Sequence, residues 1–303
     1  MNLQTAINSF LLEQTIRGNS PVTVSGYRAI LGYFRSFAGD LDVETIDLDL
    51  LRSYYFHLHQ SGLESVSVQS YIRHLRAFLN WLYSSELIET DFCRKFKLPK
   101  AKRPIVDVLT DSEISALFGA YQGDDFRNVR NRAILALFLD AGLRLNELVN
   151  IQRAMIHVSE GYVIVDGKGN KQRAVPFGVM TRIYLKEYLS IAPKSPSLFL
   201  SSREEDGSFF PITEATVKMM FRRLKAVVPR IYPHLLRHTF ATRYLENGGN
   251  MYSLQMLLGH TSLEMVKRYV HLAQRKVLRD FVNYSPLDRF QSENTTAKIG
   301  GFE

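Results

Sequence analysis

The sequence predicts a mainly α-helical protein that carries one small antiparallel β-sheet. Apolar residues recur at helical spacing through residues 1–92 and again in several segments of residues 111–272. Residues 155–165 and 172–177 alternate in polarity and flank the turn-forming sequence GKGNK, which is the pattern of a β-hairpin. The sequence RKFKLPKAKR at residues 94–103 separates the two periodic regions, which predicts two domains joined by a linker.

Each helix of the first region is predicted from its own stripe of apolar residues, which is typical of a packed core. The four stripes, in order, are Phe10, Leu11 and Ile16; Tyr27, Ile30, Leu31 and Phe34; Leu50, Tyr54 and Leu58; and Tyr71, Leu75, Phe78, Leu79 and Leu82. Arg73 and Arg76 lie off the fourth stripe, where they either contact a phosphate backbone or face solvent.

The second region is predicted from helix-end signals as well as periodicity. Residues 111–121 form a helix with Thr110 or Asp111 as N-cap. Residues 130–140 are strongly apolar and predict a buried helix that ends at Gly142. Arg144 follows at once, at the start of the next helix, where backbone N–H groups also favour an anion. A short β-strand is expected at residues 197–200.

The composition limits the class of protein. Of the 303 residues, 46% are hydrophobic, which predicts a packed core, and no apolar run approaches the roughly 18 residues of a membrane span. The N-terminal sequence MNLQTAINSFLLEQTIRGN lacks the basic region and cleavage site of a signal peptide. The single cysteine, Cys93, excludes an internal disulfide and a cysteine-rich metal site. A cytoplasmic location is the default expectation.

Positive charge is concentrated in the C-terminal two-thirds. The formal net charge is +8. Residues 1–100 contain 10 Lys and Arg and 10 Asp and Glu, so the whole excess lies in residues 101–303. A basic region favours a polyanionic partner, although many basic proteins bind none.

Three basic segments are candidate DNA contacts. The linker holds six basic residues in ten, and it either follows phosphates or acts as a solubilising tether. The hairpin turn carries lysines that either reach DNA or face solvent. Residues 213–228 predict an amphipathic helix that suits a major groove or is a charged surface helix. The candidate residues in these segments are Lys95, Lys97, Lys100, Lys102, Lys168, Lys171, Lys218, Arg222 and Arg223.

Residues 233–272 carry the groups needed to attack a phosphodiester without a metal. Pro233 opens a helix on which His234, Arg237, His238 and Ala241 share one face and apolar residues share another. The apolar face consists of Leu236, Phe240 and Tyr244. A glycine pair ends this helix, and a short helix ending at Gly259 follows.

Tyr269 is the candidate nucleophile. A tyrosine hydroxyl has a pKa near 10, so it needs a base, for which histidine is suited. Arginine stays charged and binds two phosphate oxygens at once, so Arg144 and Arg237 together can hold both non-bridging oxygens as charge develops. Lys168 can protonate the leaving 5′ oxygen. The covalent link conserves the bond energy, so rejoining needs no ATP.

Four segments resemble the tyrosine recombinase (integrase) family, and the resemblance extends over nearly the whole chain. AGLRLNEL resembles its first arginine box, GKGNKQR its hairpin lysine box, HLLRHTFAT its His-x-x-Arg box and LLGHTSLEMVKRYVH its Gly-His…Tyr box. The four boxes occur in the family's order. The resemblance implies these roles: Arg144, Lys168, His234, Arg237 and His260 as the activating set, Tyr269 as nucleophile, and Glu147 and His238 at supporting positions. It makes Lys168 the general acid, with Lys171 as the second candidate.

The resemblance also implies the architecture. A helical core-binding domain (residues 1–93) and an α+β catalytic domain (residues 109–285) would form a C-shaped clamp around duplex DNA. Residues 94–108 would be the linker and residues 286–303 a tail. The layout resembles the Xer-like recombinases and simple mobile-element integrases of bacteria and archaea.

The implied reaction is site-specific recombination through a 3′-phosphotyrosine intermediate and a Holliday junction. The partners would be a double-stranded recombination site and three further copies in a homo-tetramer. The C-terminal helix of the family docks on a neighbour; residues 276–290 are the candidate for that role, or they pack on their own domain. Whether an accessory protein sets the direction of recombination stays open. No cofactor, metal, ATP or membrane is expected.

Three alternatives stay open. A type IB topoisomerase uses similar chemistry, although the spacing of the boxes favours a recombinase. A metal site would use His234, His238, His260 and His271, but the cationic Arg237 among them argues against it. The third is a DNA-binding protein without catalysis, which would never become covalently attached to DNA.

Overall fold

The computed structural model describes residues 1–95, 107–167, 172–202 and 208–259. The chain divides into two compact units, Met1–Pro104 and Ile105–Glu303. The boundary between them falls within the predicted linker, residues 94–108. Among the described residues, no helix has the length and apolar character needed to cross a membrane.

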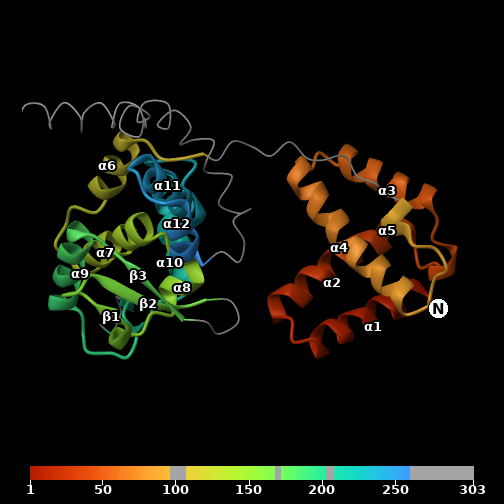
Figure 1. The fold of residues 1–303 in the computed structure, drawn as a ribbon, viewed down its shortest axis with the longest axis horizontal. Coiled ribbons are helices and arrows are strands. Elements are labelled where there is room, and N and C mark those ends of the chain that lie inside the picture. The colour runs from red at the N-terminus through yellow and green to blue at the C-terminus, as the bar shows by residue number, and fades with distance from the viewer. Residues whose placement is uncertain (96–106, 168–171, 203–207, 260–303) are drawn as a thin grey trace, which may run out of the picture. The chain divides into compact units, whose positions relative to one another are not determined.

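The N-terminal unit is a helical bundle (Figure 1). Its elements are α1 (Leu3–Ile16), α2 (Pro21–Ala38), η1 (Val43–Thr45), α3 (Leu48–Gln60), α4 (Ser65–Ser84) and α5 (Phe92–Lys95). Side-chain oxygens cap several helix starts; the Ser20 hydroxyl, for example, accepts a hydrogen bond from the backbone N–H of Thr23 at 3.2 Å. Phe10, Phe34 and Phe78 are fully buried in the shared core. The four long helices occur where the apolar stripes predict them.

Two details of this unit differ from the prediction. Ile16, assigned to the first stripe, lies in the last turn of α1 and is 74% exposed, because that turn projects beyond the bundle core. The linker was predicted to begin at Arg94, but Arg94 and Lys95 belong to α5. Phe92 is buried and anchors this short helix on the bundle.

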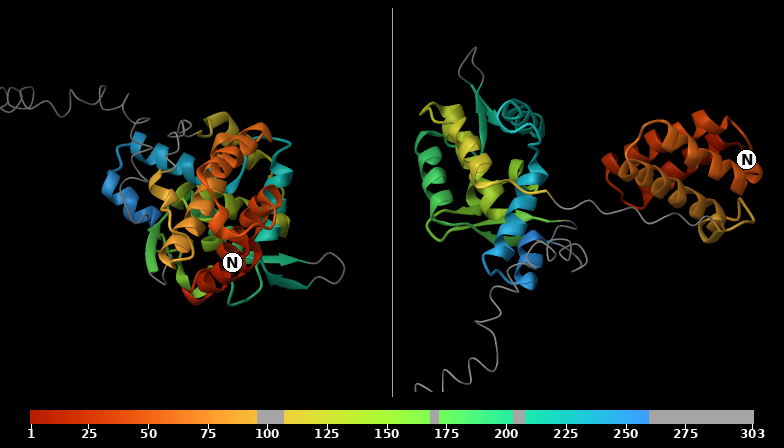
Figure 2. Two further views of the ribbon diagram at one scale, coloured as in Figure 1. Left: turned by 90° about the vertical axis from the view of Figure 1, so that its right-hand side faces the viewer. Right: turned by 90° about the horizontal axis from the view of Figure 1, so that it is seen from above.

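The C-terminal unit combines helices with two small sheets. Its helical elements are α6 (Asp111–Gly119), α7 (Phe126–Ala141), α8 (Leu145–Val149), η2 (Arg153–Met155), α9 (Val179–Ile191), α10 (Glu214–Leu224), α11 (Pro233–Glu246) and α12 (Met251–Leu258). The buried helix α7 packs against α9 and α11 (Figures 1 and 2). Helix α9 was not predicted from the sequence.

Helix α7 begins earlier than its apolar run suggests, and its first turns bury two arginines. Arg130 is 5% exposed and donates through Nη1 to the carbonyl of Leu200 at 3.0 Å. Arg132 is 8% exposed and pairs with Glu187 at 2.6 Å. Paired and hydrogen-bonded guanidinium groups can be buried, which is why a basic sequence begins a core helix.

The main sheet has three antiparallel strands in the order β1 (Ile156–His157), β2 (Tyr162–Asp166), β3 (Gln172–Pro176). Val163 pairs with Val175, and both are buried. The prediction of one continuous strand over residues 155–165 is wrong. The chain turns back at Gly161, whose φ of +80° suits glycine, so that the segment forms two strands instead of one.

A second sheet pairs β4 (Leu200–Ser202) with β5 (Phe209–Pro211). The strand expected at residues 197–200 therefore lies slightly later, and its partner β5 was not predicted. The predicted fold class, mainly α with a small antiparallel sheet, is confirmed, and the second sheet adds to it.

Candidate active site

The side chain of Arg237 joins three segments of the C-terminal unit. It lies on α11 and is 3% exposed. Its Nη1 donates to the carbonyl of Gly142 at 2.5 Å, and its Nη2 donates to the carbonyl of Leu258 at 2.6 Å. Arg237 therefore ties the end of α7 and the end of α12 to the middle of α11.

Gly142 ends α7 in a left-handed conformation, with φ 58° and ψ 33°. A Cβ atom at this position would lie 2.3 Å from the ring of Phe240, so both the backbone and the space require glycine. The turn directs the chain into α8 and makes Arg144 the N-cap of that helix. Gly142 and Arg237 together thus determine where Arg144 lies.

Glu147 holds Arg144 in place through two hydrogen bonds. The backbone N–H of Arg144 donates to Glu147 Oε2 at 2.8 Å, and Arg144 Nη1 donates to Oε1 at 2.7 Å. The Arg144 side chain is 33% exposed, whereas that of Glu147 is 5% exposed. Glu147 therefore orients an arginine whose guanidinium still reaches solvent.

Arg173 is a site residue that the sequence analysis missed. It lies on β3, and its Nη1 and Nη2 donate to the two carboxylate oxygens of Glu147, each at 2.9 Å. Its Nε donates to the carbonyl of Leu257 at 2.8 Å. The signal available in the sequence was alternation: Arg173 shares the inward face of β3 with Val175, where a cation needs a buried partner.

Glu147 is ionised despite its burial. Burial alone would raise the pKa of the Glu147 carboxyl, but hydrogen bonds and charge from Arg173, together with hydrogen bonds from Arg144, outweigh burial and hold the pKa below its ordinary value. The site therefore contains a carboxylate between two guanidinium groups, with Arg237 bound to the adjoining backbone.

The two histidines of α11 lie one turn apart, with ring centroids 6.4 Å apart. His234 is exposed and His238 is half-buried. The predicted division of α11 into one apolar and one polar face is wrong. Ala241 and Arg237 are buried, whereas Phe240 and Tyr244 are only half-buried, because α11 packs against α7 on one side and α12 on another.

Several predicted residues lie outside the described part of the chain. They are Lys168, Lys171, His260 and Tyr269 of the site, Lys97, Lys100 and Lys102 of the linker, residues 276–290 and the tail from residue 286. Of the predicted catalytic set, the structure describes Arg144, His234 and Arg237, and it joins Arg144 to Arg237 through Gly142.

The described candidates for DNA contact differ in what they bind. Arg73 and Lys95 are exposed. Arg76 is half-buried and donates to the carbonyl of Cys93 at 2.8 Å, so it anchors α5 on α4. On α10, Lys218 pairs with Glu214 at 2.7 Å, and Arg222 and Arg223 are exposed.

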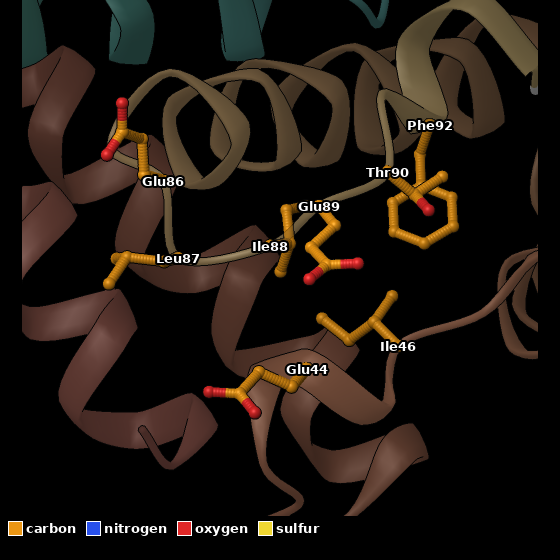
Figure 3. A pocket seen from close by; sticks show the side chains of 8 residues that line it. All are labelled: Glu44, Ile46, Glu86, Leu87, Ile88, Glu89, Thr90 and Phe92. Atoms are coloured by element: carbon orange, nitrogen blue, oxygen red, sulfur yellow. The ribbon is translucent and has the colours of Figure 1, made fainter.

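A cavity of about 510 Å³ in the N-terminal unit has a different chemistry. Figure 3 shows its lining, which includes the carboxylates of Glu44, Glu86 and Glu89. Three carboxylates repel phosphate, so this pocket does not suit the DNA backbone. Within the described ranges, no group of three His, Cys, Asp or Glu side chains has a metal-binding arrangement.

Comparison of the sequence with known proteins identifies the family of this chain. Residues 107–276 match the model of the phage integrase family, and residues 3–98 match the phage integrase SAM-like domain. The chain belongs to the tyrosine recombinases of the phage integrase family. The tyrosine recombinase XerC of Staphylococcus haemolyticus is 33% identical over 287 residues, which cover 91% of this chain and 95% of that protein.

Solved structures of tyrosine recombinases share the fold. The Tn1549 transposon integrase in complex with a circular intermediate DNA aligns with a TM-score of 0.73 at 19% identity, over 92% of this chain and 99% of that chain. A lambda integrase tetramer bound to a Holliday junction aligns with a TM-score of 0.70 at 19% identity, over 86% of this chain and 78% of that chain.

This tyrosine recombinase is therefore a site-specific DNA recombinase, and DNA is its substrate. The resemblance seen in the four sequence boxes is confirmed. Because the relatives at about one-third identity are recombinases, recombination is favoured over the topoisomerase alternative.

Proposed function

We propose that Tyr269 attacks a DNA phosphate that is held between Arg144 and Arg237. The observation that carries this proposal is the hydrogen bond from Arg237 Nη1 to the carbonyl of Gly142, two residues before Arg144. It links the two arginines through one short, conformationally restricted segment, so that their separation is set by the fold.

The charge of the site suits a phosphodiester. Arg144, Arg173 and Arg237 carry three positive charges, and Glu147 supplies the one carboxylate that contacts them among the described residues. A net positive site stabilises the negative charge that develops on the non-bridging oxygens in the transition state. Arg144 supplies the solvent-reaching guanidinium, whereas Arg237 supports the site from the interior.

The proposed reaction forms one bond to phosphorus, breaks another and transfers two protons. The Tyr269 hydroxyl gives its proton to a histidine of the set, His234 or His260, and its oxygen forms a bond to phosphorus. The bond from phosphorus to the 5′ oxygen breaks, and Lys168 protonates that oxygen. The product is a 3′-phosphotyrosine link and a free 5′ hydroxyl. Attack by a 5′ hydroxyl of the partner strand reverses these steps without ATP.

We propose that four copies act on two double-stranded sites and pass through a Holliday junction. The shared fold with the lambda integrase tetramer on a Holliday junction supports this assembly. Both units would contact duplex DNA, residues 276–290 would dock on a neighbouring copy, and an accessory protein would be a further partner. A cytoplasmic location is consistent with this role.

DNA would be held by cations outside the cleavage centre. Exposed side chains on α4, α5 and α10 reach solvent and can neutralise phosphates. The proposed backbone contacts are Arg73, Lys95, Lys97, Lys100, Lys102, Lys171, Lys218, Arg222 and Arg223. Arg76, which donates to the carbonyl of Cys93, is assigned a structural role instead.

Covalent trapping tests the proposal. A duplex is selected from a random-sequence library by binding to Tyr269→Phe, and versions nicked at each position in turn are mixed with the wild-type protein. We expect a protein–DNA adduct on a denaturing gel that is absent with Tyr269→Phe, although this variant binds the same DNA. An adduct of equal yield with Tyr269→Phe would overturn the assignment of the nucleophile.

A second measurement separates recombination from strand relaxation. Plasmids with two copies of the selected duplex are incubated with the protein and tested for exchange between copies. We expect exchange that requires both copies. Relaxation of a plasmid with one copy, without exchange on two, would instead favour the topoisomerase alternative.

A further inference from the structure

Arg173 uses all three of its guanidinium nitrogens inside the protein. Nη1 and Nη2 bind the two oxygens of Glu147 in a bidentate pair at 2.9 Å, and Nε binds the carbonyl of Leu257 at 2.8 Å. Its side chain is 13% exposed. A guanidinium occupied in this way has no planar edge left for a phosphate, so Arg173 does not bind the substrate itself.

The partner of Arg173 is the residue that holds Arg144. Each carboxylate oxygen of Glu147 is shared: Oε1 accepts from Arg144 Nη1 at 2.7 Å and from Arg173 Nη1, while Oε2 accepts from the Arg144 backbone N–H at 2.8 Å and from Arg173 Nη2. The three side chains form one connected cluster. Within the described part of the chain, Arg144 Nη2 and Nε have no hydrogen-bond partner.

The charge of this cluster decides what Arg144 can do. Two guanidinium groups and one carboxylate leave a net charge of +1, so Arg144 keeps a charge for an incoming phosphate. Without Arg173, Arg144 and Glu147 would be a neutral pair. A buried carboxylate with a single partner would hold that partner tightly, in competition with the phosphate.

Arg173 also supports the end of α12. The carbonyls of Leu257 and Leu258 accept from Arg173 and Arg237, respectively. A Cβ atom at Gly259 would lie 3.1 Å from Arg173 Nη1, so the guanidinium lies directly against that backbone. Cations at the last carbonyls of a helix are favourable. Arg173 therefore contacts both Glu147, the partner of Arg144, and the backbone at Gly259, the residue before His260.

We propose that Arg173 is a positioning residue that neutralises Glu147, keeps the charge of Arg144 available to the DNA phosphate and joins β3 to the end of α12. This inference rests on the proposed role of Arg144 in binding the phosphate. Arg173 acts through Glu147 and touches neither DNA nor the reacting atoms.

The test measures covalent attachment in a single turnover, with the nicked duplex selected as above and protein in excess. We expect Arg173→Gln to bind this duplex about as tightly as the wild type and to form the adduct about 10- to 100-fold more slowly. A wild-type rate for Arg173→Gln would overturn the inference.

A conservative variant separates charge from packing. Arg173→Lys keeps the positive charge but not the bidentate pair. We expect its rate to exceed that of Arg173→Gln by about fivefold or more, since charge neutralisation of Glu147 is retained. Equal rates for the Lys and Gln variants would contradict the charge argument.

A double-mutant cycle identifies the route of the effect. Glu147→Gln removes the charge that Arg173 neutralises, so Arg173→Gln should slow this variant further by no more than about threefold. The same loss in both backgrounds would show that Arg173 does not act through Glu147. Arg230→Gln is the matched control, because Arg230 forms a comparable pair with Glu113 and a bond to the carbonyl of Val108. We expect its adduct rate to equal that of the wild type.

The Arg144→Gln variant separates a failure of the proposed function from a failure of the inference about Arg173. A wild-type rate for Arg144→Gln would overturn the proposed function, and the inference with it. Loss of adduct formation in Arg144→Gln with a wild-type rate in Arg173→Gln would overturn the inference alone.

Discussion

The guanidinium of Arg237 donates a hydrogen bond to the backbone carbonyl of Gly142, 95 residues earlier in the chain. Gly142 is the left-handed residue that ends α7, and Phe240, one turn after Arg237 on α11, packs where its side chain would be. The contact joins the second proposed phosphate-binding arginine to the turn that positions the first. The predictions below concern this contact, the neighbouring carboxylate Glu147 and the proposed DNA contacts on α4 and α10.

Gly142→Ala should lower both stability and activity. An alanine at φ 58° is strained by about 1–2 kcal/mol, and its Cβ also collides with the Phe240 ring. We expect the free energy of unfolding to fall by about 2–4 kcal/mol in urea titrations. Adduct formation should slow by more than the loss of folded protein explains, because Arg144 moves with the turn.

The control for this variant is Gly62→Ala. Gly62 also has a positive φ, of 71°, but the space at its Cβ position is open, so only backbone strain is added. We expect a loss of about 1–2 kcal/mol and no change in adduct formation by the folded protein. Equal stability losses at the two glycines would contradict the clash with Phe240.

Substitution of Arg73 should affect DNA binding, whereas substitution of Arg76 should affect stability. Arg73 is exposed on α4, whereas Arg76 donates to the carbonyl of Cys93 at 2.8 Å. We expect Arg73→Gln to weaken DNA binding without changing the melting temperature. Arg76→Gln should lower the free energy of unfolding by about 1 kcal/mol, measured in isolated residues 1–104 and in the full chain. A large binding loss in Arg76→Gln with unchanged stability would reverse these roles.

Arg222 should contribute to the salt dependence of DNA binding. It is exposed on α10, the basic helix proposed to contact phosphates. If it neutralises one phosphate, Arg222→Gln reduces the slope of log affinity against log salt by about 0.9. Affinities for the selected duplex and for unrelated duplexes should fall by the same factor.

Lys186 provides the matched comparison for Arg222. It is exposed on α9, which packs on α7 and lies away from α10 in Figure 1. We expect Lys186→Gln to leave the salt slope unchanged. Equal changes of slope in the two variants would show that the measurement reports net charge and not a contact at α10.

Glu147 should make stability depend on pH on the acidic side. Its pKa in the folded protein lies below the ordinary value of the unfolded chain, near 4.3, so its contribution is fully present above that pH. The contribution is lost as pH falls through the lowered pKa. At neutral pH, Glu147→Gln should cost about 3 kcal/mol, because the Glu147 side chain is only 5% exposed and the substitution removes the carboxylate that pairs with two arginines.

Urea titrations between neutral pH and about pH 3 measure this difference. We expect the free energies of unfolding of the wild type and of Glu147→Gln to converge as pH falls. Other depressed carboxyls, such as Glu113, titrate in both proteins and cancel in the comparison. A constant difference over the whole range would contradict an ionised Glu147.

Much of the fold was predictable because it is locally encoded. The apolar stripes predicted the four N-terminal helices, and Gly142 and Gly259 were recognised as helix ends, both of which have the left-handed conformation. The strands were less predictable. Gly161 was a turn signal within residues 155–165, but the alternating pattern alone did not show that the chain reverses there, because that choice depends on the pairing of β1 with β2 in the folded sheet.

The sequence by itself determined the family and the reaction class, and it predicted the types of residue that carry the chemistry, since these follow from side-chain types at characteristic spacings. Only the tertiary structure showed that Arg173 pairs with Glu147, 26 residues away, and that Arg237 is anchored on Gly142. The physical reason is that a guanidinium can pair with any carboxylate or carbonyl that the fold brings within reach. Sequence spacing specifies neighbours along one helix or strand, whereas the electrostatics of this site arise where α8, α11, α12 and β3 meet.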